Sequence, residues 1–189
     1  AATTMLIPLK AIGELRRLAD DAKAERTTEK DPSVVITHSG PNAFFDLAGM
    51  RFSVKLVDAQ YPPYQQVIPK TTERLVRAPR RSLAEALDAV RIAASDRTGG
   101  VKLSTLPNLL RVTSESPESG NGFDEVPADF EGTEMTIGFN AKYFLDVLNA
   151  LEDDEVVLGV SGELDPVVLR PASETDKESF IAVVMPMRI

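Results

Sequence analysis

The chain has 189 residues, of which 43% are hydrophobic and 26% charged, and its formal net charge is −8 at pH 7. Such a length fits one large or two small globular domains. The lack of cysteine excludes disulfides, thiolate catalysis and cysteine-ligated zinc, and no apolar run approaches the ~20 residues that span a bilayer. We therefore expect a cytoplasmic protein without a membrane association. The net acidity argues against nucleic-acid binding driven by overall charge, but a local basic face could still bind phosphate.

The first predicted module begins with the apolar stretch Met5–Leu9. A helix is expected from about Lys10 to Ala24, because apolar residues recur there at helical spacing. Its apolar stripe would consist of Ile12, Leu15, Leu18 and Ala22. Three strands are predicted to follow, at Val34–Ser39, Asn42–Leu47 and Met50–Val57.

The second module begins with a predicted strand at Arg74–Ala78. Ser82, followed three residues later by Glu85, has the spacing of a capping box and predicts a helix start. The apolar stripe of this helix would consist of Leu83, Leu87, Val90 and Ala94. The predicted strands are Val101–Leu106, Leu109–Ser116 and Phe123–Phe130.

The third module begins with a predicted strand at Met135–Phe139. Asn140 is placed to cap a helix that runs through Leu151, because its side chain can accept a hydrogen bond from a free amide of the first turn. The buried stripe would consist of Phe144, Leu145, Leu148 and Leu151. The predicted strands are Glu155–Val160, Pro166–Leu169 and Phe180–Met185.

The three modules repeat one order of elements: strand, helix, then three strands. The strings MLIPLKAIGEL and MTIGFNAKYFL are alike across the strand-to-helix junction. A repeat of about 60 residues indicates units that bury their apolar faces against one another. The sequence therefore predicts an α+β fold of repeated βαβββ units, with helices covering one side of largely antiparallel sheets.

Two strings do not follow simply from the repeat. The first, KLVDAQYPPYQQVIPK at residues 55–70, runs from a strand into two prolines flanked by tyrosines, which favours a rigid surface segment. It is either a binding surface or a domain linker packed on its own aromatics. The second, FIAVVMPMRI at residues 180–189, ends in methionines around a proline. It is either a core strand reaching its end or an adaptable apolar binding surface.

No pattern of catalytic residues is present in the sequence. His38 is the sole histidine and falls within a predicted strand, and no Gly-x-Ser-x-Gly turn or glycine-rich phosphate loop occurs. The acidic run Glu152–Glu155 could hold a hard cation or form a solvated loop. We therefore expect a non-catalytic protein without a cofactor or metal.

The strings KLVDAQYPPYQQVIP, IGFNAKYFLDVLNAL and VVMPMRI resemble, in order and spacing, parts of the bacterial replication sliding clamp, the beta subunit of DNA polymerase III. The resemblance covers essentially the whole chain. It implies a DNA-clamp fold with sheets outside and helices on the inner face. It also implies that residues 1–70 are the second half of a middle domain and residues 71–189 a complete C-terminal domain.

The function implied by the resemblance is that of a processivity clamp. Such clamps are homo-oligomeric rings that encircle duplex DNA and tether the replicative polymerase, the clamp loader and repair proteins through short linear peptides. Gln66 is a departure, because many relatives carry arginine at that position. The residues expected around the peptide are Pro62, Gln66, Val67, Asn140, Tyr143, Val183, Met185, Pro186, Met187 and Arg188.

The resemblance also implies a DNA-facing inner surface and a subunit interface. The basic candidates for the inner surface are Lys10, Arg16, Arg17, Arg80, Arg81, Arg91 and Lys142. They could instead pair with Glu14, Asp20, Glu85 and Asp88 at helical spacings. The interface is expected near Ile92 and at an edge strand that contains Val101 and Leu103.

Three hypotheses follow. In the first, the chain is a fragment of a clamp that has the clamp's fold and part of its peptide pocket. In the second, it is a short clamp form that binds peptides or assembles differently without encircling DNA. In the third, it is an unrelated α+β enzyme that uses acidic residues.

Overall fold

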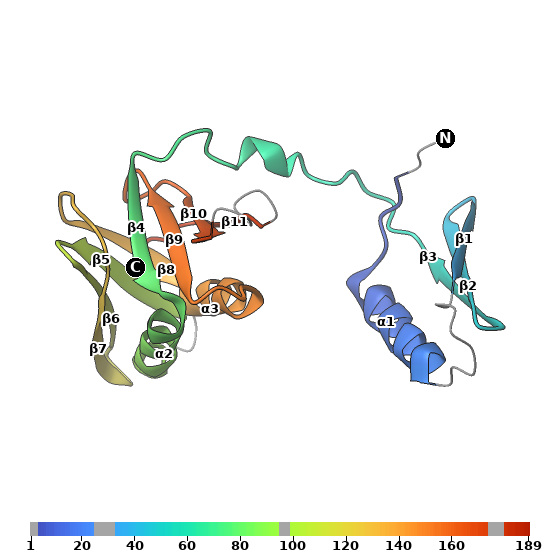
Figure 1. Ribbon diagram of the computed structural model, residues 1–189, viewed down its shortest axis with the longest axis horizontal. Coiled ribbons are helices and arrows are strands. Elements are labelled where there is room, and N and C mark those ends of the chain that lie inside the picture. Colours follow the sequence, from blue (N-terminus) through green and yellow to red (C-terminus); the bar gives the residue numbers. More distant parts are fainter. Residues whose placement is uncertain (1–3, 25–32, 95–98, 174–179) are drawn as a thin grey trace. The chain divides into compact units, whose positions relative to one another are not determined.

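The computed structural model describes residues 4–24, 33–94, 99–173 and 180–189. These residues fall into two compact units, unit 1 (Ala1–Pro62) and unit 2 (Pro63–Ile189). Figure 1 shows the helices and strands of each unit. No helix among the described residues is long and apolar enough to cross a membrane.

Unit 1 is one helix packed on a three-stranded antiparallel sheet of order β1-β2-β3. The side chains buried under the helix come mainly from the middle strand, and they include Phe45 and Leu47. Phe45 also contacts Phe52 of the next strand, with ring centroids 6.2 Å apart. The elements are α1 (Leu9–Ala24), β1 (Val34–Ser39), β2 (Asn42–Leu47) and β3 (Met50–Lys55).

The strand predicted at Met5–Leu9 is wrong, because residues 4–8 have no strand structure and Leu9 begins α1. The predicted apolar stripe of this helix is also only partly buried: Ala22 is buried, but Ile12 is 44% exposed. Both departures have one physical reason: among the described residues, no strand lies beside residues 5–8 to pair with them and cover the helix.

Unit 2 contains two copies of the predicted βαβββ module. The first copy consists of β4 (Arg74–Pro79), α2 (Arg80–Val90), the short 3-10 helix η2 (Arg91–Ala93), β5 (Gly100–Leu106), β6 (Leu109–Ser116) and β7 (Gly120–Pro127). The second consists of β8 (Met135–Asn140), α3 (Ala141–Ala150), β9 (Glu155–Val160), β10 (Val167–Pro171) and β11 (Ala182–Val184). A 3-10 helix, η1 (Tyr64–Gln66), precedes them.

The two modules of unit 2 exchange their first strands. Strand β4 of the first module pairs antiparallel with β9 of the second, and β8 of the second pairs antiparallel with β5 of the first. The resulting sheets have the orders β11-β10-β9-β4 and β7-β6-β5-β8. Helices α2 and α3 contact each other and lie at the same end of unit 2 (Figure 1).

The predicted helix stripes of unit 2 form its core. Leu83, Leu87 and Val90 of α2 are buried, as is Ala94 beyond it. The predicted stripe of α3, Phe144 to Leu151, is buried as well, with Phe139 and Phe144 in ring contact at 5.0 Å. These stripes confirm the helical periodicity that the sequence shows.

The two predicted helix caps have different outcomes. Asn140 caps α3 as predicted, because its side chain accepts a hydrogen bond of 3.0 Å from the backbone N–H of Lys142. The capping box at Ser82 is wrong. Pro79 is the N-cap of α2, so Ser82 lies within the helix. Pro79 has the extended backbone of an N-cap, and the helix begins directly after it, two residues before Ser82.

The segment between the units packs on unit 2. The backbone N–H of Glu73 donates to the hydroxyl of Ser161 at 3.3 Å, and a Cβ on Gly159 would meet the side chain of Thr72 at 2.7 Å. The compact units divide between Pro62 and Pro63, whereas the sequence suggests a boundary near residue 70.

Arg80 joins the start of α2 to the end of α3. Its guanidinium donates from Nε to the carbonyl oxygen of Asp153 at 2.6 Å and from an Nη to the carbonyl oxygen of Leu148 at 3.1 Å. Leu148 is one of the last residues of α3, where carbonyl oxygens lack partners within the helix. The cation therefore satisfies these carbonyls and complements the helix dipole.

We expect Arg80→Ala to destabilise the protein by about 1–3 kcal/mol, because two partly buried hydrogen bonds from a charged donor are lost. Urea unfolding followed by circular dichroism measures this. The matched control is Arg81→Ala, since Arg81 is exposed and forms no recorded ion pair with a described residue. Equal stability of the two variants would contradict the capping role of Arg80.

Candidate functional site

The C-terminal tail, residues 185–189, lies on the surface of unit 2. It follows β11, in which Val184 pairs with Val167 of β10. The tail then reaches β8, where the backbone N–H of Met187 donates to the carbonyl oxygen of Gly138 at 2.8 Å. Met185 is 57% exposed, so the tail is not sealed in the core.

The first hollow, called the tail hollow, lies between the tail and the start of α3. Its volume is about 400 Å³ and its walls are mainly apolar. Asn140 and Tyr143 form one wall, because β8 ends at Asn140 and α3 begins directly after it. The tail hollow is lined by Asn140, Tyr143, Val183, Val184, Met185 and Met187.

The second hollow, called the linker hollow, lies beside the segment that leads into β4. Its volume is about 440 Å³. Met185 lines both hollows, so the exposed methionine stands between them. The linker hollow is lined by Gln66, Val67, Pro69, Thr71, Ser161, Asp165, Pro166 and Met185.

Most of the residues expected around a peptide lie at these two hollows. Gln66 and Val67 line the linker hollow, whereas Asn140, Tyr143, Val183 and Met187 line the tail hollow. Pro186 and Arg188 belong to the tail but line neither hollow. Pro62 is the last residue of unit 1, so its part in the site stays a prediction.

Several lining residues had no signal in the sequence. Ser161, Asp165 and Pro166 come from the loop between β9 and β10, which has no periodic pattern. Among the described residues that line the linker hollow, Asp165 alone is charged. Gln66 is uncharged, so the described lining of this hollow contains no basic group that could bind an acidic ligand.

Three of the seven basic candidates for DNA contact are already engaged. Arg80 caps α3, and Arg91 forms an ion pair with Asp88 at 2.7 Å. Arg17 forms ion pairs with Glu14 and Asp21 on its own helix, and its hydrogen bond lowers the pKa of the Glu14 carboxyl below its ordinary value. The guanidinium of Arg80 is held by carbonyl oxygens, so its expected inner-surface role stays a prediction.

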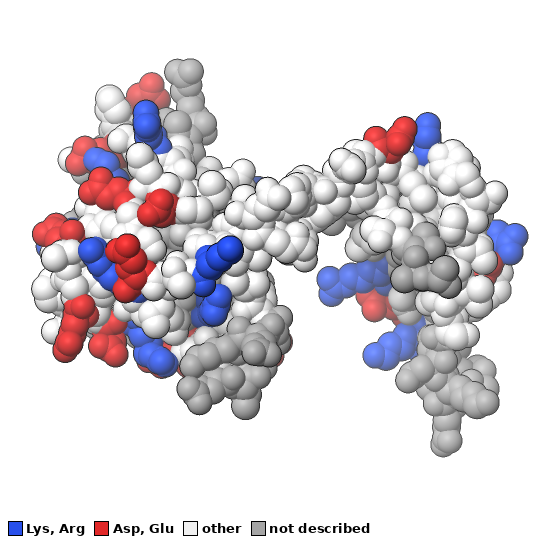
Figure 2. Space-filling view, turned by 90° about the horizontal axis from the view of Figure 1, so that it is seen from above, with Lys and Arg blue, Asp and Glu red and all other residues white. Residues whose placement is uncertain are grey.

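The other four candidates are exposed and have no recorded ion pair with a described residue: Lys10, Arg16, Arg81 and Lys142. In unit 2, the groove between α2 and α3 mixes both charges. Glu85, Asp88 and Asp146 line it together with Arg91 and Lys142. The face of unit 2 in Figure 2 likewise shows acidic and basic side chains interspersed. Any phosphate contact by this unit would rely on few cations.

The expected interface at Val101 and Leu103 is wrong in two respects. Strand β5 is not an edge strand, because β6 and β8 pair with it on either side. Val101 and Leu103 are also buried, at 1% and 2% exposure. Sequence alone could not show that β8 takes this edge, since β8 comes from the next module. Ile92 is 79% exposed on η2, and its place in an interface stays a prediction.

The acidic run Glu152–Glu155 has a structural role. The Asp153 carboxylate accepts a hydrogen bond of 3.0 Å from the backbone N–H of Ser173, which lowers the pKa of this carboxyl below its ordinary value. Glu155 pairs with Arg77 at 3.2 Å. Among the described residues, no group of three potential ligands could hold a metal ion.

The helices and antiparallel sheets match those of solved sliding clamps, which confirms the predicted α+β DNA-clamp fold. Residues 65–188 match the model of the DNA polymerase III beta subunit, C-terminal domain. The chain therefore belongs to the DNA polymerase III beta-subunit family. This membership confirms a non-catalytic polymerase subunit and overturns the hypothesis of an unrelated enzyme.

Known relatives resemble nearly the whole chain. The beta sliding clamp of Pseudomonas putida is 32% identical over 185 residues, which cover 98% of this chain and 47% of that protein. A sliding clamp (DNA polymerase III subunit beta) from Bartonella birtlesii, solved bound to griselimycin, is 32% identical with a TM-score of 0.85 over 98% of this chain and 47% of that one. The DNA polymerase sliding clamp of Pseudomonas aeruginosa is 30% identical with a TM-score of 0.81, over 98% and 48%. The chain thus spans about half the length of these relatives.

The position of the tail depends on Gly138. A Cβ there would lie 2.5 Å from the carbonyl oxygen of Met187 and 2.8 Å from the Ile189 side chain. We expect Gly138→Ala to displace the tail from β8, because backbone cannot yield as a flexible side chain can. Methyl NMR would then show the Met185 and Met187 signals shifted, while that of Met50 stays in place.

Gly13→Ala is the matched control, because nothing lies within 4 Å of a Cβ at that position. It should leave all five methionine signals near their original positions. Unchanged Met185 and Met187 signals in Gly138→Ala would show that the tail does not rest on β8.

Proposed function

We propose that this chain is a ring component of a bacterial replication clamp, which encircles duplex DNA without sequence preference and tethers the replicative polymerase, the clamp loader and repair proteins. The tethering would use the tail hollow and the linker hollow as a binding site for short linear peptides. The observation that carries the proposal is the exposed Met185, which lines both hollows in a member of this family. The protein would act in the cytoplasm.

Two adjoining hollows suit a short peptide with two apolar anchors. Ordering a peptide costs free energy, so a few anchors must enter hollows that already exist. Val183, Met185 and Met187 supply apolar walls, and methionine side chains adapt to anchors of different shape. A relative's structure with the peptide ligand griselimycin supports a peptide site in this family.

A fluorescently labelled Gln-Leu-Ser-Leu-Phe peptide tests this site by anisotropy titration. We expect saturable binding to the 189-residue protein. Met185→Ala should weaken it about 5-fold or more, since truncating a central anchor of an interface costs about 1 kcal/mol or more.

Met50→Ala is the matched control, because Met50 is a partly exposed methionine of unit 1 outside both hollows. It should bind the peptide like the unmodified protein. No binding at about 1 mM peptide would reject the peptide site in this chain. Equal affinities of the two variants would place binding away from Met185.

Encirclement would resolve the tension between DNA binding and the net charge of −8. A closed ring retains DNA by topology, so its contacts can be few, weak and directed at phosphate. The exposed cations Lys10, Arg16, Arg81 and Lys142 fit such contacts, and any base readout would oppose sliding. Their number is too small for strong binding by charge alone.

Retention of the protein on plasmid DNA tests encirclement. We expect more protein to co-elute with a nicked circle than with the same plasmid linearised, because a ring slides off free ends. Raising the salt should remove non-encircling protein from both forms. Equal retention on the two forms would reject encirclement and leave the alternative of a truncated clamp form that only binds peptides.

The ring also needs an interface between subunits. We propose that Ile92 and the edge strand β7 contribute to it. Strand β7 pairs with β6 alone among the described strands, and Phe123 on it is 63% exposed. An unpaired edge beside exposed apolar side chains is a natural site for strand pairing between subunits. In this proposal residues 1–70 are the second half of a middle domain, and residues 71–189 are the C-terminal domain.

A further inference from the structure

A third hollow of unit 2, called the sheet hollow, lies on the sheet β11-β10-β9-β4. Its volume is about 250 Å³. One wall is the segment of residues 69–72, and the floor comes from β4, β9 and β10, including Val157 and Val168. Successive side chains of a strand point to opposite faces of the sheet, and the next residues, Leu158 and Leu169, are buried in the core. The floor therefore belongs to the outer face of this sheet.

Gly159 brings the wall of the sheet hollow onto its floor. It lies in a row across the sheet, between Leu75 of β4 and Val168 of β10. A Cβ on Gly159 would lie 2.7 Å from the side chain of Thr72. Because Gly159 has no side chain, Thr72 can rest directly on the sheet. The nearby Lys70 thereby becomes part of the same hollow as Arg170 of β10.

The described lining of the sheet hollow contains two cations and no acid. Both cations, Lys70 and Arg170, are exposed, and neither forms an ion pair with a described residue. Arg77, by contrast, is paired with Glu155 at 3.2 Å. Thr71 adds a hydroxyl group to the lining. Ammonium, guanidinium and hydroxyl groups all donate hydrogen bonds to carboxylate oxygens, so the hollow suits an oxyanion.

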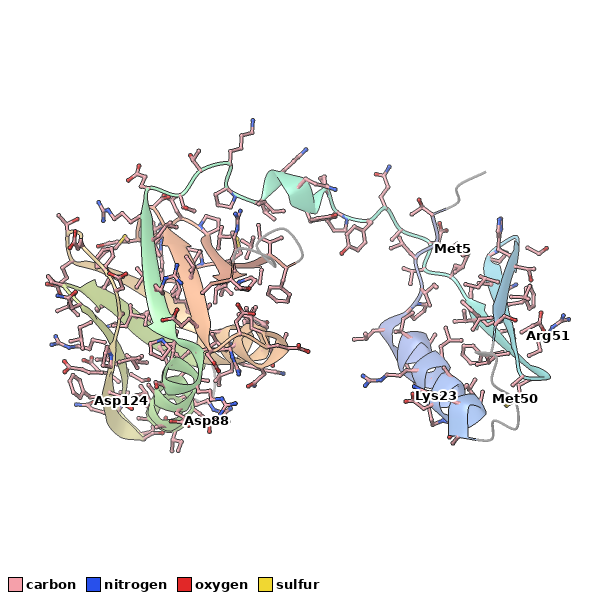
Figure 3. The ribbon with its side chains drawn as sticks, in the orientation of Figure 1. Met5, Lys23, Met50, Arg51, Asp88 and Asp124 are labelled. Carbon is pink, nitrogen blue, oxygen red and sulfur yellow. The ribbon has the colours of Figure 1, made fainter. Side chains whose placement is uncertain are left out.

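Acids elsewhere on unit 2 do not cancel this local positive charge. Figure 3 shows Asp88 on α2 and Asp124 on β7, at the end of unit 2 away from the segment that leads into β4. Salt screens exposed charges over about 10 Å at 0.1 M ionic strength. The sheet hollow can therefore attract an anion although the whole chain carries a net charge of −8.

The sheet hollow adjoins the linker hollow, because Pro69 and Thr71 line both. An extended chain advances about 3.3 Å per residue, so two or three residues beyond an anchor in the linker hollow are enough to reach the sheet hollow. The two hollows differ in charge. An acidic side chain at that point would be repelled by Asp165 of the linker hollow and attracted by Lys70 and Arg170.

We propose that the sheet hollow is a subsite for an acidic residue, which binds a Glu or Asp side chain that flanks the apolar anchors of a partner peptide. This inference rests on the peptide site of the proposed function. The described linings of the tail hollow and the linker hollow contain no cation. The sheet hollow therefore gives the site its preference among peptides of different charge.

Anisotropy titrations with extended peptides test the subsite. Labelled Gln-Leu-Ser-Leu-Phe is extended by Gly-Glu-Glu or by Gly-Gln-Gln, at one end or at the other. At one of the two ends, we expect the Glu form to bind roughly 3-fold or more tightly than the Gln form in low salt, since exposed ion pairs are individually weak. The ratio of the two affinities should fall toward one as NaCl is raised to about 0.5 M, because salt screens exposed charges.

Variants of the two cations locate the contact. Lys70→Gln and Arg170→Gln should each lower the affinity ratio, and the double variant should bring it close to one. Lys55→Gln is the matched control, because Lys55 is an exposed lysine of unit 1 outside the three hollows. It changes the net charge by the same amount as Lys70→Gln and should keep the full ratio.

Each possible failure has a different meaning. Equal affinities of the Glu and Gln forms at both ends would overturn the subsite and leave the peptide site standing. A preference for Glu that survives in the double variant would also overturn it, because the contact would then involve other cations. No binding by any peptide, including the one without an extension, would reject the peptide site and the subsite with it.

Discussion

The structure depends on one constraint: a βαβββ module cannot complete its own sheet. Its first strand lies too far from its own meander and pairs with the meander of another module. In unit 2 this exchange joins β8 to β5 and β4 to β9, and it buries Leu103, Phe139 and Val156 in one core. In unit 1, residues 4–8 pair with no described strand, and Ile12 of the helix stripe is 44% exposed.

The exchange also creates the surface on which the tail rests. Because β8 leaves its own module to pair with β5, its other edge is free to hold the tail through the Met187–Gly138 hydrogen bond. Gly138 lacks the side chain that would block this approach. The start of α3 follows directly and supplies Asn140 and Tyr143 to the tail hollow. Strand β8 is therefore part of the sheet that forms the core and also supports the tail at the candidate site.

Local patterns in the sequence predict most of the helices and strands, whereas the lining residues of the two hollows were expected from the family resemblance. The apolar periodicity of α2 and α3, the cap at Asn140 and the methionine tail are local signals, and the structure contains each of them. Pairing between modules is not local. For this reason the sequence does not show that β5 is an inner strand, or that Val101 and Leu103 are buried. The carbonyl partners of Arg80, 68 and 73 residues away in sequence, were hidden for the same reason.

Charge and topology together limit how such a chain can act on DNA. The cations Arg17, Arg80 and Arg91 are held by acids or carbonyls of the protein, and the groove between α2 and α3 contains more acids than bases. Strong charge-driven binding would need these groups released from their partners at a cost in stability. A closed ring would not need these cations to be released, because encirclement itself keeps the protein on the DNA. The property on which the proposed function depends is therefore ring closure, and the edge of β7, which is unpaired among the described strands, is the proposed place for it.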